Sequence, residues 1–308
     1  MKENILYAYH MEASHLQEFH DYSSFQFQGK TFYFTKLKRN QKEFQELLQV
    51  MQELLQKNIP ILTFVQNVQG SFVTMVGSDA YVLMEVQEET IEYGLLDILD
   101  FQNKLVLNHR HSSLYRNEWA NLWSQKVDYF EYQMHELGKN YPILLNSFSY
   151  YVGLAENAIC YARNVQNSFP DIERPVVLSH RRVIYPNVRL NFYNPLNLIF
   201  DLEVRDIGEY LKSMFFQEQE EALIDLKAYI DLRKPDAYSS SMLFARLLYP
   251  SYYFDLHERI MEADEKEEKL LPIIDQVEAY ELFLKKAWNL LNSYSPIEPV
   301  AWILKEES

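Results

Sequence analysis

The sequence predicts an α+β protein with two lobes, in which a small antiparallel sheet with one long helix precedes a larger, mainly helical part. Segments with the period-two alternation of strands cluster in the first third of the chain, whereas most later segments repeat apolar residues with the period of a helix. The length of 308 residues is enough for two separate hydrophobic cores. We therefore expect one boundary and two domains, residues 1–87 and 88–308.

The strands of the first lobe are predicted from alternation and from turn residues. Residues 30–38 alternate as a strand after a turn at Gly29. Residues 61–66, 71–76 and 81–86 are three more short apolar runs separated by glycine-containing turns, which is typical of an antiparallel sheet.

One helix is predicted inside this lobe. Asn40 followed three residues later by Glu43 is a helix N-cap signal, and apolar residues then recur at helical spacing from Phe44 to Leu55. Residues 1–28 show no clear pattern, and residues 88–94 form a polar bridge to the second lobe.

The second lobe is predicted to be a succession of helices. Short strands are expected only within residues 176–200, around a loop. Ser147 is the candidate N-cap of a helix over residues 147–164, and Pro250 is expected to bend or break a later one. The helical segments expected in this lobe are residues 95–113, 117–137, 147–164, 217–231, 239–260 and 272–291.

The charge and glycine content exclude several functions. With 44 acidic and 29 basic residues, the formal net charge of −15 repels phosphate backbones, so we expect no nucleic-acid partner. The chain has 7 glycines and none of them are neighbours, so the glycine-rich loop that usually cradles phosphate is missing. His109 and His111 have no third ligand nearby, so no metal site is predicted.

The sequence predicts neither membrane insertion nor a disulfide framework. No segment approaches the ~20 apolar residues that span a bilayer, and the first fifteen or so residues lack the apolar core of a signal peptide. The single Cys160 is expected to be a small buried core residue. The 23 Tyr and 19 Phe exceed the expected needs of the core, which favours contacts with other proteins and leaves self-association open.

A loop between two apolar runs resembles a known catalytic loop. It reads His180, two arginines, four further residues and Asn187, and it is similar to the loop of the protein-kinase-like superfamily in its aminoglycoside-phosphotransferase and choline-kinase branch. The resemblance implies a kinase-like fold. It also places Arg182 where the family has its catalytic carboxylate and Asn197 where it has a magnesium-binding Asp. Arginine stays protonated and has no acceptor, so it cannot take up the substrate proton.

The same resemblance implies roles for further residues. The segment from Asp201 to Leu211 is similar to the family's closing motif, with Asp206 at its structural Asp. In the first lobe, Lys36 or Lys38 would be the lysine that holds nucleotide phosphates. Glu43 or Glu46 would be the partner of that lysine.

A more specific resemblance covers most of residues 145–260. The segments SFSYYVGLAENAICYARN, FDLEVRDIGEYL and FARLLYPSYYFD, with the loop at His180, resemble YutH-like spore-coat proteins of the CotS type. The resemblance implies a role in sporulation, synthesis in the mother-cell cytoplasm, a final location in the spore coat, and other coat proteins as partners.

Three functions are compatible with these residues. The first is a degenerate, non-catalytic kinase-like protein, a pseudokinase, that acts in spore-coat assembly or structure and needs no cofactor. The second is a small-molecule phosphotransferase that uses ATP, magnesium and a displaced acid, either Asp201 or Glu203. The third is a nucleotide- or sugar-binding module whose cleft retains Asn187, Asn197 and one of the two lysines.

Overall fold

The structure is a computed structural model that describes residues 1–19, 22–86, 93–107, 111–116, 118–170, 175–185, 192–263 and 265–304. The chain divides into two compact units. The first comprises Met1–Glu92, Arg110–Tyr115 and Asn187–Ile199, and the second comprises Tyr93–His109, Arg116–Pro186 and Phe200–Ser308. The boundary predicted between residues 87 and 88 lies outside the described residues, and two later segments belong to the first unit.

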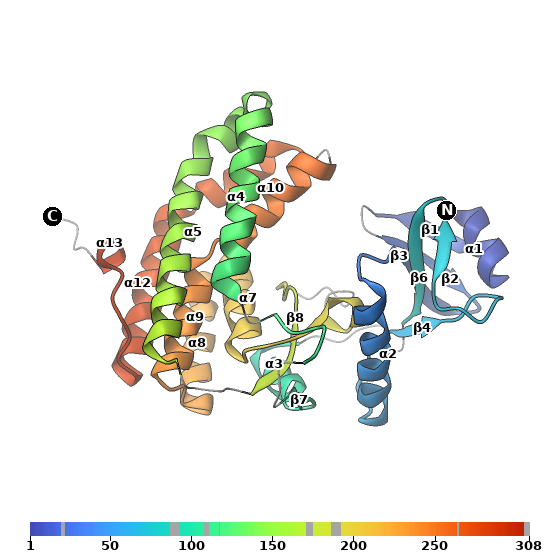
Figure 1. Cartoon of the computed structure of the whole chain (residues 1–308), viewed down its shortest axis with the longest axis horizontal. Helices are drawn as coiled ribbons and strands as arrows, with labels where there is room; N and C mark the ends of the chain where they lie inside the picture. Colours follow the sequence, from blue (N-terminus) through green and yellow to red (C-terminus); the bar gives the residue numbers. More distant parts are fainter. Residues whose placement is uncertain are drawn as a thin grey trace. The chain divides into compact units, whose positions relative to one another are not determined.

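The first unit is built on a six-stranded antiparallel sheet, as predicted (Figure 1). The strand order is β1-β2-β3-β6-β4, and β5 also pairs with β6. Gly29, with a φ of 77°, makes the predicted turn between β2 and β3. The strands are β1 (Ser14–Glu18), β2 (Tyr22–Phe27), β3 (Lys30–Lys36), β4 (Thr63–Val65), β5 (Thr74–Val76) and β6 (Asp79–Glu85).

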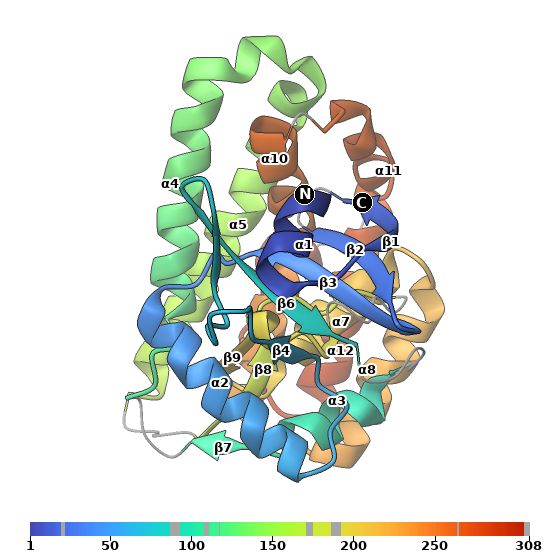
Figure 2. The same cartoon turned by 90° about the vertical axis from the view of Figure 1, so that its right-hand side faces the viewer.

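Two helices lie on opposite faces of this sheet (Figures 1 and 2). On one face, the ring of Tyr9 from α1 (Lys2–Tyr9) packs edge-on against Phe34 of β3, with 6.2 Å between the ring centroids. On the other face, Phe44 of α2 (Gln41–Gln56) contacts Phe64 of β4, with 5.1 Å between the ring centroids. The predicted cap of α2 is confirmed, because the Asn40 side chain accepts a hydrogen bond of 2.9 Å from the Glu43 backbone. The sequence pattern had not indicated α1, β1 or β2.

The second unit is mainly helical (Figure 1). Its longest helix, α5, has 27 residues and packs beside α4 and α9. The helices are α3 (Leu95–Gln102), α4 (Trp119–Leu137), α5 (Pro142–Ser168), α7 (Val204–Phe215), α8 (Gln219–Arg233), α9 (Ala237–Leu248), α10 (Ser251–Ala263), α11 (Leu271–Ile274), α12 (Val277–Tyr294) and α13 (Ala301–Leu304). Single turns of 3-10 helix in this unit are η1 (Gly138–Asn140) and η3 (Glu267–Leu270), whereas η2 (Pro195–Asn197) belongs to the first unit.

A second, three-stranded sheet confirms the short strands predicted within residues 176–200. The strand order is β7-β8-β9. The strands are β7 (Val106–Leu107), β8 (Val176–His180) and β9 (Leu198–Asp201). Every residue of β8 and β9 is buried, which fixes the start of the loop that follows His180.

The core of the second unit uses aromatic rings extensively. Tyr151 stacks on Tyr253 at 3.8 Å, and Trp123 stacks on Tyr249 at 4.4 Å. Burying one such ring contributes about 1.5–3 kcal/mol. Many of the tyrosines therefore pack in the core. The high tyrosine content is for this reason weaker evidence of a protein-binding surface than the sequence suggested.

The helix boundaries confirm one sequence prediction and correct others. Pro250 does separate α9 from α10. Ser147 lies inside α5 and donates to the Ile143 carbonyl, so it is not an N-cap, because the helix already begins at Pro142. The helix expected over residues 272–291 is interrupted between α11 and α12.

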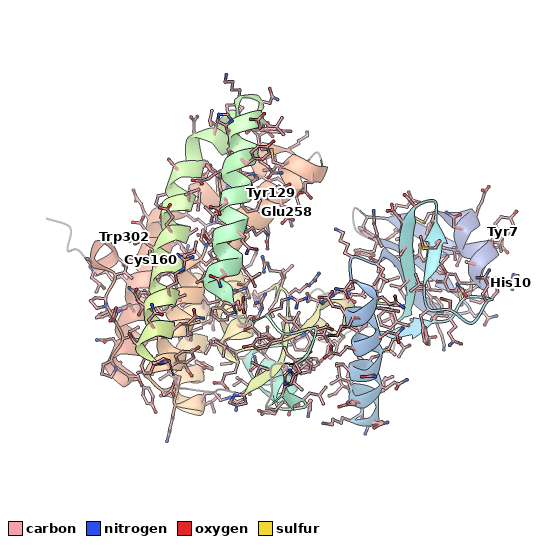
Figure 3. The ribbon with its side chains drawn as sticks, in the orientation of Figure 1. Tyr7, His10, Tyr129, Cys160, Glu258 and Trp302 are labelled. Atoms are coloured by element: carbon pink, nitrogen blue, oxygen red, sulfur yellow. The ribbon has the colours of Figure 1, made fainter. Side chains whose placement is uncertain are left out.

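Cys160 is exposed on α5, so the prediction that it is a buried core residue is wrong (Figure 3). It lies on the face of α5 opposite to the buried positions Ala158 and Ala162. Among the described residues, none of the helices is both long and apolar enough to cross a bilayer.

Candidate functional site

His180, the first residue of the catalytic-type frame, ends β8 and is fully buried. Its Nδ1 lies 2.7 Å from Oδ2 of Asp206, and its backbone N–H donates to the other oxygen of the same carboxylate at 2.9 Å. Arg205, beside Asp206 on α7, donates to the His180 carbonyl at 2.8 Å. Asp206 therefore holds the start of the loop through both oxygens of its carboxylate.

Arg182, which the resemblance places at the position of the catalytic acid, forms a two-point ion pair. Its Nε and Nη2 both donate to the carboxylate of Asp255 on α10, the second at 2.6 Å. Its Nε also lies 3.7 Å from Glu209 of α7. Burial alone would lower the pKa of Arg182. The carboxylates of Asp255 and Glu209 raise it by more, so the pKa lies above its ordinary value and the guanidinium stays charged.

Glu209 is the centre of a buried cluster of charges. One of its oxygens lies 2.7 Å from Lys212 Nζ and 2.8 Å from Arg246 Nε. Lys212 also donates to the hydroxyl of Ser251 at 2.7 Å and to the Tyr249 carbonyl at 3.1 Å. Each of these groups is hydrogen-bonded, which is the condition under which buried charges are tolerated.

The protonation of this cluster follows from burial and from neighbouring charges. Burial raises the pKa of Glu209, but Arg246, Lys212 and Arg182 together hold it well below its ordinary value. Burial lowers the pKa of Lys212 to about 7 and that of Arg246 to about 10, although Glu209 opposes both shifts. Glu209 is therefore ionised at neutral pH, where it attracts Arg246, Arg182 and the protonated form of Lys212.

Asp201, the candidate displaced acid, is fully buried at the end of β9. The indole of Trp119 donates to both of its oxygens, at 3.0 and 2.9 Å, and Arg205 donates to one of them at 2.6 Å. Burial raises the pKa of Asp201, against the opposing effect of Arg205. These contacts make the carboxylate an internal hydrogen-bond acceptor. The other candidate, Glu203, accepts a hydrogen bond of 3.2 Å from the hydroxyl of Tyr229.

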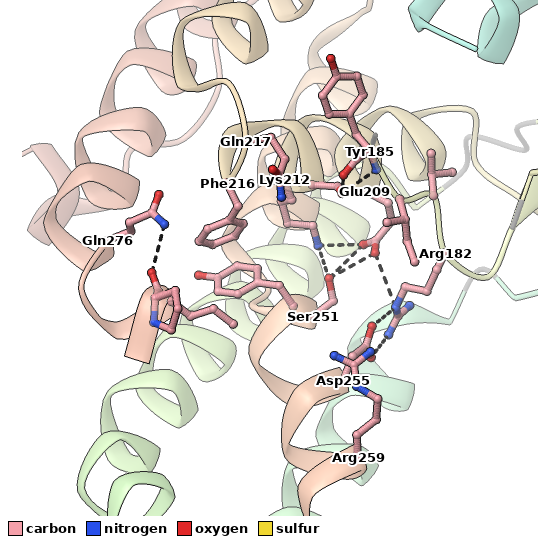
Figure 4. A pocket seen from close by; sticks show the side chains of 16 residues that line it. Arg182, Tyr185, Glu209, Lys212, Phe216, Gln217, Ser251, Asp255, Arg259 and Gln276 are labelled. Atoms are coloured by element: carbon pink, nitrogen blue, oxygen red, sulfur yellow. Dashed lines mark hydrogen bonds and ion pairs between the residues drawn. The ribbon is translucent and has the colours of Figure 1, made fainter. Parts of the chain in front are cut away.

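A pocket of about 360 Å³ lies beside this cluster in the second unit (Figure 4). Arg182 lies between Asp255 and Glu209 in this view, with Lys212 and Ser251 on the other side of Glu209. The charged side chains thus form one part of the pocket wall. The remaining wall includes apolar side chains, among them Phe216, Tyr252 and Ile273.

Asn197, which the resemblance places at the position of the magnesium-binding Asp, belongs to the first unit. It ends η2, and the buried Arg39 holds the carbonyls on either side of it, those of Leu196 at 2.6 Å and Leu198 at 2.7 Å. Asn187 lies outside the described residues. Among the residues that are described, no three His, Cys, Asp or Glu side chains gather closely enough to hold a metal ion.

The two candidate lysines of the first lobe are exposed. Lys36 forms an ion pair with Asp79 at 2.7 Å. Glu43 is buried, and its carboxylate lies 3.9 Å from the guanidinium of Arg39. Glu46 accepts hydrogen bonds from Ser113, whose backbone N–H lies 2.9 Å away.

Among the residues of these clusters that the sequence analysis missed are Arg39, Glu209, Lys212 and Asp255. For three of them the sequence spacing could have indicated an ion pair. Arg39 lies four residues before Glu43, and Glu209 lies three residues before Lys212 on α7. Asp255 had no such signal, because 73 residues separate it from Arg182.

The fold defines the class of protein. An aminoglycoside phosphotransferase from Alicyclobacillus acidocaldarius is similar with a TM-score of 0.61 at 10% identity, covering 96% of this chain and 95% of that one. The spectinomycin phosphotransferase APH(9)-Ia, solved with ADP and spectinomycin, has a TM-score of 0.58 at 10% identity, covering 94% and 97%. This chain therefore has the kinase-like fold of the aminoglycoside phosphotransferases.

The particular family follows from the sequence comparison. Residues 2–287 match the family described as "Spore coat putative kinase YutH", so the chain belongs to the YutH family of spore-coat proteins. The endospore coat-associated protein YutH of Bacillus subtilis (strain 168) is 25% identical over 216 residues, which are 62% of this chain and span 62% of the length of that protein.

Proposed function

We propose that this protein is a non-catalytic component of the spore coat that is made in the mother-cell cytoplasm and retained in the coat by contacts with other coat proteins. The observation that carries the proposal is the ion pair between Arg182 and Asp255 at the position of the catalytic acid. The family membership supports the location of the protein.

Arg182 cannot replace the missing acid. In kinase-like enzymes a carboxylate at this position accepts the substrate proton, and such help accelerates a reaction by about 10²- to 10⁴-fold. Arg182 has no acceptor atom and is held by Asp255 and Glu209. The ion pair serves the packing of the loop against α10.

The candidate displaced acids are poorly suited to take over. A general base must come within hydrogen-bonding reach of the substrate hydroxyl. Asp201 is enclosed by Trp119 and Arg205, and Glu203 accepts a hydrogen bond from the hydroxyl of Tyr229. The amide of Asn197 is a weaker magnesium ligand than the carboxylate that the family uses.

A turnover assay tests the absence of catalysis. We expect no magnesium-dependent ATP consumption above the blank for the wild type, Arg182→Ala or Asp201→Asn, with aminoglycosides, choline, sugars and coat proteins as acceptors. Arg182→Asp should remain inactive, because Asn197 still occupies the metal position. The exposed substitution Glu220→Gln is the matched control for preparation artefacts. Turnover by the wild type that Asp201→Asn abolishes, while Glu220→Gln retains it, would overturn the proposal.

Localisation is tested separately in a sporulating host. A fluorescently tagged chain under its own promoter should appear around the forespore and should be recovered in the coat fraction of purified spores. A uniform signal in growing cells, with none at the forespore, would contradict the coat assignment and leave the turnover result unaffected.

A further inference from the structure

Helices α3 and α8 of the second unit expose large apolar side chains. Leu96 on α3 is 67% exposed, and on α8 Ile224 is 57% and Leu232 is 56% exposed. Among the described residues of the second unit, these are the three most exposed aliphatic side chains. We propose that this face binds a basic amphipathic helix of a partner protein. The inference rests on the proposed function for the source of that partner, which would be the coat.

The exposed residues of α8 form an apolar stripe, made of Ile224, Ala228 and Leu232. Each lies four residues after the one before, so all three share one side of the helix. The opposite side carries the buried Leu226 and Ile230, where α8 packs against α7 and α12. A surface helix needs a single apolar face for its own core. The second apolar face of α8 is therefore available to a partner.

Helix α3 extends the apolar stripe. Arg233, at the end of α8, donates from Nη2 to the Leu99 carbonyl at 3.1 Å and to Oδ1 of Asn103 at 3.3 Å. Leu96 lies on α3 one turn before Leu99. These contacts place Leu96 and Leu232 in the same region of the surface.

The charge of the two helices favours a cationic partner. Residues 95–104 and 218–234 contain seven acidic and four basic residues, so their formal net charge is −3. The acidic residues are Asp97, Asp100, Glu218, Glu220, Glu221, Asp225 and Asp231, and the basic ones are Lys104, Lys227, Arg233 and Lys234. Lysine or arginine side chains beside an apolar stripe of a partner would be attracted to this face.

Acids that border the apolar stripe are not neutralised within the described part of the protein. Glu221 lies three residues before Ile224, and Asp231 lies three residues after Ala228. Both are exposed, and neither forms an ion pair among the described residues. Asp225 accepts a hydrogen bond of 2.9 Å from a neutral tyrosine hydroxyl, which leaves its charge in place. These carboxylates can therefore pair with cations of a partner.

Other occupants fit this face less well. A second copy of the chain, with a formal net charge of −15, would bring the same acids against one another. An anionic membrane surface would be repelled for the same reason. The combination of an apolar stripe and an acidic border thus selects a basic amphipathic segment.

Three synthetic peptides of about 18 residues, long enough to form a helix, test the chemistry of the partner. The first has a leucine stripe at helical spacing flanked by lysines, the second has the same composition without the stripe, and the third has glutamate in place of lysine. Binding to the full chain is measured by fluorescence anisotropy at about 0.15 M salt. We expect the first peptide to bind at least about tenfold more tightly than either of the others. No binding of the first peptide, or equal binding of the first and either other peptide, would overturn the inference.

Paired variants then locate the surface. Leu232→Ser should weaken the first peptide by about three- to tenfold through the loss of apolar contact, whereas the exposed Leu282→Ser on α12 should have no effect. Asp231→Asn should weaken it by about two- to fivefold, and Lys227→Gln on the same helix should strengthen it by about twofold. Equal responses of Leu232→Ser and Leu282→Ser would refute the assignment, while circular dichroism verifies that each variant is folded.

Sedimentation and localisation separate this inference from the proposed function. A dimer of the full chain that Ile224→Ser dissociates would assign the face to a second copy and overturn the inference. In a sporulating host, Leu232→Ser should be recovered in the coat fraction less than Leu282→Ser. Equal recovery of the wild type and Leu232→Ser would refute the surface and leave the coat assignment intact. Absence of the wild type from the coat would contradict the proposed function, and the peptide titrations alone would then decide the surface.

Discussion

The guanidinium of Arg182 and the carboxylate of Asp255 form a two-point ion pair that joins the loop after β8 to α10. In both residues 29% of the side chain is exposed, so the pair is screened only partly by solvent. Because bidentate pairs of this kind are stronger than ordinary surface pairs, the two residues should be coupled in the folded state.

We predict this coupling from a double-mutant cycle of Arg182→Ala and Asp255→Ala. The interaction free energy should be about 1–2 kcal/mol in urea unfolding. The cycle of Lys30→Ala and Glu85→Ala is the matched control, because Lys30 is 60% exposed, and it should give about 0–0.5 kcal/mol. Equal coupling in the two cycles would mean that the Arg182 pair has no special structural role.

The buried carboxylate of Glu209 should be essential for stability. Glu209→Gln leaves Lys212, Arg246 and Arg182 without their common counter-ion, so we expect a loss of about 3–5 kcal/mol in the free energy of unfolding. The exposed Glu218→Gln should change this quantity by at most about 0.5 kcal/mol. A loss below about 1 kcal/mol for Glu209→Gln would show that the cluster is easily rearranged.

Two glycines within helices should respond in opposite directions to alanine. A Cβ at Gly208 of α7 would lie 2.6 and 3.0 Å from side-chain atoms of Arg246, so Gly208→Ala should cost about 1–3 kcal/mol. A Cβ at Gly153 of α5 meets nothing within 4 Å, so Gly153→Ala should stabilise the fold by about 0.5–1 kcal/mol through helix propensity. Thermal unfolding of the two variants checks the contrast. Stabilisation by both would show that α7 and α9 are not tightly packed here.

Stability should decrease in mild acid because of His257. This histidine is fully buried between Phe130 and Phe148, and among the described residues neither of its ring nitrogens has a hydrogen-bond partner. Burial, followed by the charge of Lys126, lowers its pKa from 6.5 to about 4. Between pH 6.5 and about pH 4 the unfolded chain therefore binds more protons than the folded protein. Stability is complete above about pH 6.5 and falls as the pH drops towards 4, by about 3 kcal/mol in total.

His257→Leu should remove this pH dependence while the free energy of unfolding at pH 7 changes little. The control His135→Leu should retain the dependence, because the His135 side chain is 83% exposed. Urea titrations between pH 4 and 7 give the comparison. The same slope in the wild type and in His257→Leu would assign the acid sensitivity to other groups.

Local sequence signals were sufficient for the order of elements and for several boundaries. The cap at Asn40 and the break at Pro250 were predicted correctly, because each depends on hydrogen bonds or ring geometry within a few residues. The kinase-like order followed from periodicity and from the frame around His180. The predicted beginning at Ser147 was wrong, because Pro142 already provides a suitable first turn further upstream.

The sequence by itself determined the fold class and the family resemblance, and that resemblance predicts Arg182 at the position of the catalytic acid. Tertiary structure alone decided what that arginine does, because its partner Asp255 is 73 residues away and no local pattern links the two. The same holds for Asp201, whose burial depends on Trp119 from a distant helix. Cys160 was predicted to be buried but is exposed. The sequence of an apolar helix such as α5 does not show which of its faces will be covered by other helices. Side-chain partners and burial arise from contacts between elements far apart in the chain, and these are fixed only when the elements pack.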